Sequence, residues 1–166
     1  MTELPRMLQA DVLAAYPEPE FLRPWRVIVT CKLMNLCTAD QARGVVYNLF
    51  GAWDHPARLA SAGEGLEELL RPLGMKSVRA AALRQMSYDF QRGVPAERCF
   101  GVGQYAVESL RIFIGGDLNF EPDDVKLRAY VRAAKAVKSA ALPTECCGGD
   151  EDDCIWGIAN CPKERS

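Results

Sequence analysis

The stretch that decides the fold is Phe100-Gly101-Val102-Gly103-Gln104-Tyr105, which lies between two segments with a helical pattern of apolar residues. Gly101 and Gly103 predict a tight reversal of the chain, because glycine tolerates positive φ angles. The next helix is expected to begin at Gln104 and to end at Ile114. Uncovered backbone N–H groups at such a helix start, with the helix dipole behind them, favour a phosphate without reading base sequence. An ordinary helix–helix turn is the alternative interpretation.

A second decisive stretch, Glu121-Pro122-Asp123-Asp124-Val125-Lys126-Leu127, follows that helix. Pro122 predicts a helix start, since proline is favoured in the first turn. Asp123 and Asp124 would then both lie in the first turn, where the helix dipole stabilises negative charge. The plain interpretation is a helix cap, which is the commonest use of aspartate at this position. We expect at least one of the two acids to do more than that.

The remaining pattern is helical as well, and the predicted fold class is all-α. Thr38 and Gln41 have the spacing of a capping box. His55, the single histidine, precedes Pro56 and is expected to cap or lie at the surface rather than to catalyse. No alternating run of strand length and no glycine-rich phosphate loop after a strand is present. The expected helices are 8–16, 25–36, 38–50, 56–60, 66–70, 77–91, 104–114 and one from 122 through 134.

Several separated blocks, in this order along the chain, resemble the helix-hairpin-helix DNA glycosylases of the endonuclease III superfamily. The blocks are most similar to thymine/uracil mismatch glycosylases, notably the domain linked to a methyl-CpG-binding domain. The resemblance implies an all-α helix-hairpin-helix glycosylase fold with a DNA cleft between two helical lobes. It also implies cleavage of an N-glycosidic bond after a pyrimidine is flipped out of duplex DNA. The blocks are Pro24-Trp25, Leu33-Met34-Asn35, Leu70–Gly74, Val78-Arg79-Ala80, Gly101–Tyr105, Ser109–Phe113 and Pro122–Leu127.

The resemblance assigns roles to the two ends of the working segment. Asp124 matches the essential aspartate, which would stabilise positive charge developing at the anomeric carbon and orient water. Tyr105 matches the position at which bifunctional members carry a Schiff-base lysine, so a glycosylase without lyase activity is expected. Asn35 and Leu36 would lie at the base pocket, at the end of the central helix.

The resemblance also assigns the DNA contacts. Met75, in the loop after Pro72, would fill the gap left by the extruded base, because an apolar wedge replaces lost stacking. A monovalent cation bound at the hairpin is part of the same expectation. The residues predicted to contact DNA are Gly101, Val102, Gly103, Gln104, Met75, Lys76 and Lys126.

The chain differs from the mismatch enzymes at Leu36. Those enzymes have an arginine at this position, which reaches toward the guanine opposite the flipped base. This departure keeps a second class open, a phage-type transferase that attaches an amino acid to pyrophosphorylated 5-hydroxymethyluracil in DNA. Asp124 would then act as a base toward a free amino acid, the co-substrate. A third class is a DNA-binding relative without catalysis, against which the retained Asp124 weighs.

Charge and cysteine content separate a body, 1–143, from a tail, 144–166. The chain has 20 basic and 22 acidic residues, and the positions from 145 onward hold two bases and six acids. The body therefore carries a surplus of two positive charges, which is compatible with double-stranded DNA as partner. The tail could bind an iron–sulfur cluster or Zn²⁺, with disulfides or a free irregular tail as alternatives. Its cysteines are Cys146, Cys147, Cys154 and Cys161.

No apolar run long enough for a membrane helix and no signal peptide is present, so an intracellular protein without membrane contact is expected. We expect it to act as a monomer.

Overall fold

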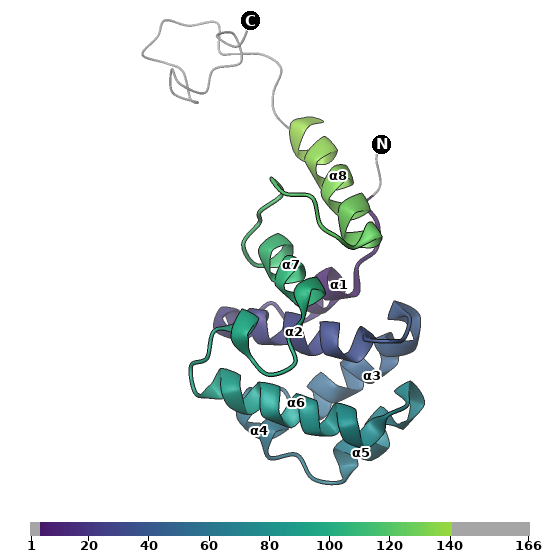
Figure 1. Cartoon of the computed structure of the whole chain (residues 1–166), viewed down its shortest axis with the longest axis vertical. Helices are drawn as coiled ribbons and strands as arrows, with labels where there is room; N and C mark the ends of the chain where they lie inside the picture. The colour runs from purple at the N-terminus through teal and green to yellow at the C-terminus, as the bar shows by residue number, and fades with distance from the viewer. Residues whose placement is uncertain (1–3, 141–166) are drawn as a thin grey trace, which may run out of the picture.

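The structure is a computed structural model that describes residues 4–140 (Figure 1). All regular structure within this range is helical, which confirms the predicted all-α class for the described residues. The predicted tail and its four cysteines lie outside them. The elements are α1 (Leu8–Ala15), η1 (Glu20–Leu22), α2 (Arg23–Met34), α3 (Ala39–Ala52), α4 (Pro56–Ala60), α5 (Gly65–Leu70), η2 (Arg71–Leu73), α6 (Lys76–Gln91), η3 (Ala96–Arg98), α7 (Gln104–Phe113) and α8 (Val125–Ala140).

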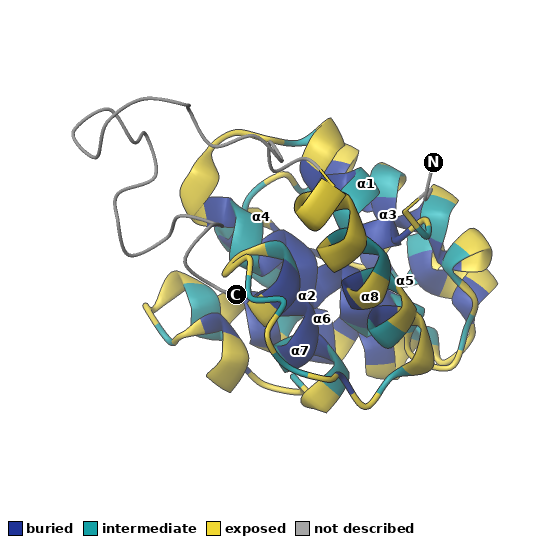
Figure 2. Ribbon diagram, turned by 90° about the horizontal axis from the view of Figure 1, so that it is seen from above, coloured by how far each residue is buried: buried dark blue, intermediate teal, exposed yellow. Residues whose placement is uncertain are grey.

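Helix α2 forms the centre of the fold, and its ribbon is buried over most of its length (Figure 2). It contacts α1, α3, α6 and α7, so it must be apolar on nearly every side. Trp25 is fully buried in its first turn, where the indole N–H donates to Ser87 Oγ at 3.0 Å. The Trp25 ring also meets Phe50 edge to face, with 5.4 Å between centroids. The C-terminal end of this helix forms part of the candidate functional site.

Local sequence signals place several helix starts. Thr38 and Gln41 form the expected capping box, in which the Thr38 side chain accepts from the Gln41 N–H. His55 Nδ1 accepts from the Ala57 N–H at 3.2 Å, so this histidine caps α4 as expected. Both signals act within one turn of the chain, and for that reason they can be read from sequence alone.

Two local expectations were wrong. Helix α8 begins at Val125 rather than at Pro122, and Asp124 lies just before it instead of inside its first turn. The Asp124 backbone carbonyl accepts from the Arg128 N–H at 2.9 Å, which is the first bond of the helix. In the hairpin, Gly101 has a φ of +73°, whereas Gly103 is extended with φ −103° and ψ 179°. Only Gly101 therefore requires the conformational freedom of glycine.

Helix α8 lies at the end of the molecule farthest from α4, α5 and α6 (Figure 1). It packs on α7 through a small cluster that is separate from the main core. The rings of Phe113 and Tyr130 add a tilted contact with centroids 5.1 Å apart. This packing sets the start of α8 beside the start of α7. The buried members of the cluster are Met7, Ile112, Leu127 and Val131.

Among residues 4–140, no helix has both the length and the apolar character that crossing a membrane requires.

Candidate functional site

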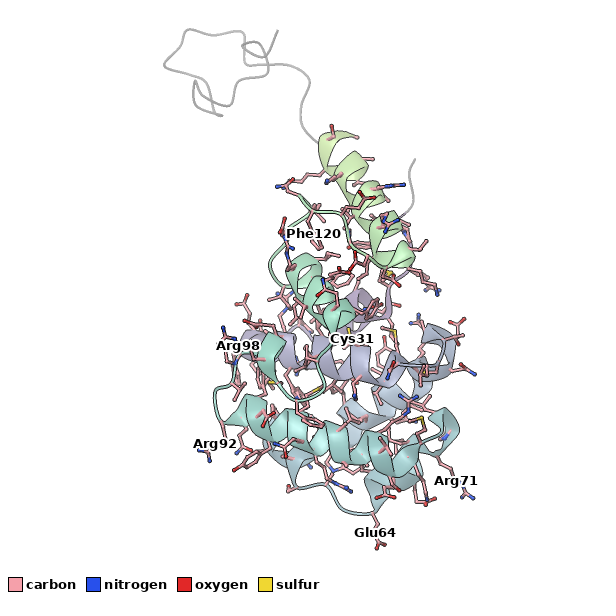
Figure 3. All side chains as sticks on the ribbon, viewed as in Figure 1. Cys31, Glu64, Arg71, Arg92, Arg98 and Phe120 are labelled. Atoms are coloured by element: carbon pink, nitrogen blue, oxygen red, sulfur yellow. The ribbon has the colours of Figure 1, made fainter. Side chains whose placement is uncertain are left out.

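A cavity of about 400 Å³ opens where the end of α2, the hairpin, the start of α7 and the segment before α1 meet. Three cations line it: Arg6, Lys32 and Lys126. Among residues 4–140, no aspartate or glutamate belongs to its lining. Cys31, labelled in Figure 3, lies at the floor of this region, where α2 meets α7. The cavity is therefore positively charged on its walls, which favours an anionic ligand.

Asp124 lies next to this cavity but outside its lining. One carboxylate oxygen, Oδ1, accepts from the backbone N–H groups of Lys126 and Leu127, both at 2.9 Å. This geometry is that of an N-cap, so the plain interpretation of the residue is correct as far as Oδ1 goes. The second oxygen, Oδ2, takes part in no hydrogen bond or salt bridge between described residues. The position of the carboxylate is thus fixed, and Oδ2 is left without a partner among the described residues.

Tyr105 lines the cavity and feels the charge of Asp124. The Tyr105 hydroxyl lines the cavity region and accepts a 2.8 Å hydrogen bond from Gln9 Nε2. Burial raises the pKa of Tyr105 to about 12, and the negative charge of Asp124 acts in the same direction. The phenol is therefore neutral at physiological pH and keeps its own proton to donate.

Gln9 is a site residue that our sequence reasoning missed. Its side chain is fully buried, and its amide nitrogen also lies 3.2 Å from Ser109 Oγ and 3.6 Å from Cys31 Sγ. The amide oxygen, Oε1, is buried without a hydrogen-bond partner in the described residues. An unpaired buried acceptor costs free energy unless a ligand or water satisfies it. A glutamine inside the apolar run of α1 was the signal available in the sequence.

The chain turns before α7 as its sequence predicts, with Gly101 alone of the two glycines at positive φ. Val102 N–H donates to the Cys99 carbonyl at 3.2 Å, and Gly103 is the N-cap residue of α7. Lys32 reaches this turn from α2, and a Cβ placed on Gly101 would lie only 3.0 Å from Lys32 Nζ. Lysine at this position was not identified from sequence, because it belongs to the central helix and not to the hairpin motif. It adds a positive charge to the uncovered N–H groups.

Glu108, a second residue missed in the sequence, connects the hairpin helix with the aspartate segment. It is 3% exposed, and its Oε1 accepts from Gln104 Nε2 at 3.0 Å and from the Asp123 N–H at 3.1 Å. The side-chain amide of Gln104, a residue predicted to contact DNA, is therefore hydrogen-bonded inside the protein. The bond to Asp123 fixes the backbone immediately before Asp124.

Arg79 joins the two segments that were predicted to face the base and the gap. Asn35 and Leu36 follow α2 and line the cavity, whereas Met75 and Lys76 lie outside its lining. Lys76 Nζ forms a 2.8 Å salt bridge with Glu68, so its charge is shared within the protein. The buried Arg79 guanidinium donates to carbonyls of both segments. The structure thus joins the two segments through Arg79, but of these four residues only Asn35 and Leu36 line the cavity.

No group of three or more histidine, cysteine, aspartate or glutamate side chains that could hold a metal ion occurs within residues 4–140. The three cysteines of this range are free thiols. Burial raises the pKa of Cys31 to about 11 and that of Cys99 to about 11 as well. These thiols are therefore packing residues and not nucleophiles at neutral pH. The predicted cysteine site of the tail lies outside the described residues.

A neutral phenol, a capping aspartate with one open oxygen and a cationic cavity beside a glycine hairpin define an all-helical protein suited to a polyanionic substrate. No family model matches the chain. Comparison with curated proteins relates it to DNA glycosylases. The chain is 32% identical over 111 residues to a methyl-CpG-binding domain protein 4-like protein of Arabidopsis thaliana. The matched region covers 64% of this chain and 25% of that protein.

A second similar protein is the thymine/uracil-DNA glycosylase of Pyrobaculum aerophilum, with 29% identity over 124 residues. This similarity covers 69% of the chain and 52% of the relative. The chain therefore spans about a quarter of the length of the first of these relatives and about half of the length of the second.

Proposed function

We propose that this chain is a monofunctional DNA glycosylase with a helix-hairpin-helix fold, which acts as a monomer on double-stranded DNA. It would flip a thymine- or uracil-type pyrimidine from the duplex and hydrolyse its N-glycosidic bond. The observation that carries the proposal is Asp124, whose Oδ2 is open and whose charge acts on Tyr105 in the lining of a cationic cavity. The similarity to a thymine/uracil-DNA glycosylase supports the same class of substrate.

The chemistry follows from charge. As the bond between the anomeric carbon and the base nitrogen breaks, its electron pair leaves with the base and positive charge develops on the sugar. Asp124 Oδ2 would stabilise that charge and orient the water that adds to the carbon. The attacking water gives one proton to solvent as its oxygen bonds to the anomeric carbon. The base leaves with the electron pair as an anion on its ring nitrogen and takes up one proton from solvent, so that one water is added in total. A fixed carboxylate serves this role better than a mobile one, because no reorganisation is needed during the reaction.

Recognition of the base would use the groups that the cavity leaves unsatisfied. Gln9 Oε1 can accept a hydrogen bond from a ring N–H of a pyrimidine, and the Tyr105 hydroxyl can donate to a carbonyl oxygen. A thymine or uracil edge offers both partners. Asn35, exposed at the end of α2, lies on the same cavity and adds an amide to the set.

The DNA grip would come from the hairpin and the cations around it. The N–H groups near Gly101 and Gly103 would hold a phosphate, aided by Lys32 and Lys126. A monovalent cation is a weaker fit at this hairpin than the sequence predicts, since the Lys32 ammonium already stands against Gly101 and would repel it. For the tail, a metal on its cysteines stays a proposal that metal analysis of wild type and of Cys147→Ser and Cys154→Ser variants tests.

The absence of lyase activity is also part of the proposal. Tyr105 offers no amine, but Lys32 and Lys126 line the same cavity. Borohydride trapping on a duplex with a preformed abasic site tests both lysines at once. We expect no covalent adduct and no strand cleavage. A trapped adduct would show that the enzyme is not monofunctional.

The central experiment is a product assay by mass spectrometry. Duplexes carry T:G, U:G, 5-hydroxymethyluracil or its pyrophosphoryl ester, with and without free amino acids. We expect an abasic site and a free base, abolished in Asp124→Asn. The matched control is Asp123→Asn, which removes the neighbouring exposed carboxylate and should leave turnover unchanged. A heavier base on an intact sugar bond would establish the amino acid transferase instead, and no product on any duplex would favour a DNA-binding relative.

A further inference from the structure

Glu108 is a buried carboxyl group that packing alone does not explain. It is 3% exposed, and within residues 4–140 it forms no salt bridge. Its Oε2 atom is buried without a hydrogen-bond partner among the described residues. Taking a polar oxygen out of water without giving it a partner lowers stability. Residues that break the packing rules in this way are expected at functional sites, so we looked for a role in the contacts of Oε1.

The other oxygen, Oε1, has two partners. It accepts from Gln104 Nε2 at 3.0 Å and from the Asp123 N–H at 3.1 Å. Gln104 lies one turn before Glu108 on α7, so its bond restrains the carboxyl group on the surface of that helix. Gln104 and Asp123 are both exposed residues, and a donor at the surface can bond to water at little cost. The buried carboxyl is therefore not needed to satisfy these donors.

The bond to Asp123 has no counterpart elsewhere in this interface. Among the described residues, it is the only hydrogen bond that joins the stretch 121–140 to α7. The other contacts between α7 and α8 are the small apolar cluster and the ring pair of Phe113 and Tyr130. Apolar contacts are non-directional, whereas a hydrogen bond requires a defined distance and angle. Glu108 is thus the directional contact between the two segments.

The segment before α8 is held rigidly to that helix. The Arg128 guanidinium donates to the carbonyls of Pro122 and Asp123, both at 3.1 Å. The Arg128 N–H donates to the Asp124 carbonyl at 2.9 Å. Three consecutive carbonyls are therefore bonded to one residue of α8, and the segment moves with the helix. A bond from α7 to the Asp123 N–H consequently restrains the Asp124 carboxylate, one residue farther along the chain.

Helix α7 is a suitable reference for that restraint, because it carries the other parts of the site. It begins at the hairpin and bears Tyr105, three residues before Glu108. It packs on α2 on one side and on α8 on the other, and Figure 1 shows it between them. The same helix therefore holds the hairpin, the phenol and the carboxyl group that bonds to the segment of Asp124.

We propose that Glu108 is a positioning residue, whose bond to the Asp123 N–H sets the Asp124 carboxylate relative to Tyr105 and the hairpin. The inference rests on the proposed function for the reaction that Asp124 serves. A misplacement of about 1 Å in a reacting group can cost about 10²-fold in rate. Loss of the bond should therefore slow base release. Duplex binding should be unchanged, because it uses the hairpin and the cations of the cavity.

The first test needs no substrate. Hydrogen exchange of the native protein is followed by NMR at the amides of Asp123, Lys126 and Leu127. In wild type, the Asp123 amide should be protected like the other two, which bond to Asp124 Oδ1. In Glu108→Leu, the Asp123 amide should exchange at least about tenfold faster, whereas the amides of α2 keep their rates. An unprotected Asp123 amide in wild type overturns the inference, whether or not the variant folds.

The second test separates rate from binding. Single-turnover base release and duplex Kd are measured on a U:G duplex. Glu108→Leu, which has no acceptor, should release base about tenfold to hundredfold more slowly and bind within about twofold of wild type. Glu108→Gln keeps an acceptor oxygen without the charge, so it should restore the rate to within about threefold of wild type.

The matched control is Glu64→Gln. It removes a carboxylate from an exposed residue at the end of the molecule away from α8, labelled in Figure 3. Both its rate and its duplex binding should equal those of wild type within about twofold, because Glu64 lies outside the cavity lining and far from the hairpin.

The results that overturn the inference differ from those that overturn the proposed function. An unchanged rate in Glu108→Leu, or a fall in binding as large as the fall in rate, overturns the inference even if the protein releases bases. Equally slow release by Glu108→Gln assigns the effect to charge and also overturns it. No base release by wild type on any duplex overturns the proposed function. The exchange rate of the Asp123 amide in Glu108→Leu then decides alone whether Glu108 holds the segment of Asp124.

Discussion

In the proposed mechanism Asp124 has two tasks, one for each oxygen, and substitutions can separate them. Oδ1 accepts two N–H bonds at the start of α8, and Oδ2 is open to the site. Asparagine keeps an oxygen at the Oδ1 position and is as good an N-cap as aspartate, so Asp124→Asn should change the free energy of unfolding by less than about 0.5 kcal/mol. Alanine removes the cap, and Asp124→Ala should cost about 1 kcal/mol, which lowers Tm by about 3 °C.

Both substitutions remove the carboxylate that would face the sugar in the proposed reaction. Loss of a single preorganised electrostatic group costs about 10²–10³ in turnover, and we expect at least that loss in both variants. Stability is measured by urea unfolding and activity by single-turnover base release on a U:G duplex. Binding of the duplex should stay within about twofold of wild type in Asp124→Asn.

The decisive outcome is the pattern across the two variants. Equal loss of turnover with unequal loss of stability supports separate tasks for Oδ1 and Oδ2. If turnover falls in Asp124→Ala but is retained in Asp124→Asn, the residue acts as a helix cap alone, and the proposed chemistry has no carboxylate.

Three other predictions follow from the same region. The folded protein should lose stability between pH 10 and 12. The unfolded chain ionises Tyr105 near its ordinary pKa of 10.0, whereas burial raises the pKa of Tyr105 in the folded protein to about 12. In Tyr105→Phe that part of the decline should vanish from alkaline unfolding curves, and its persistence would refute the assignment. Gly101→Ala should weaken duplex binding by about tenfold or more, because the new Cβ would lie 3.0 Å from Lys32 Nζ and residue 101 has a φ of +73°. The control is Gly63→Ala, at a position where a Cβ meets no other atom. Cys31 should resist iodoacetamide at pH 8 in the folded protein and react on unfolding, because its folded pKa is about 11; rapid native labelling detected by peptide mass spectrometry would contradict its burial.

Much of the fold could be predicted because its signals are local. The capping box at Thr38, the proline in the first turn of α2 and the hairpin before Gln104 each act within a few residues. The start of α8 was misplaced by three residues for a related reason: Pro122 and Asp124 are both signals for a helix start, and the side-chain bonds of Asp124 decide between them.

The supporting residues of the site could not be predicted from sequence. Gln9 and Tyr105 are separated by 96 residues, and their hydrogen bond exists only because α1 and α7 both pack on α2. Arg79 in sequence is one of many arginines on an amphipathic helix, and nothing local shows that its guanidinium is buried among carbonyls. Glu108 likewise has the pattern of an ordinary helix surface until α8 covers it.

The way in which α8 packs on the rest of the protein has a consequence for local opening of the site. It rests on α7 and four buried side chains, whereas the hairpin and Tyr105 belong to the body built around α2. Segments with few buried contacts open at a lower free energy than the whole protein unfolds. Amide hydrogen exchange should therefore be faster in α8 than in α2, and a duplex that bridges the hairpin and Lys126 should slow it. The distance between Asp124 and Tyr105 thus depends on the packing of α8 on α7, and in the proposed function the substrate itself would complete the active geometry.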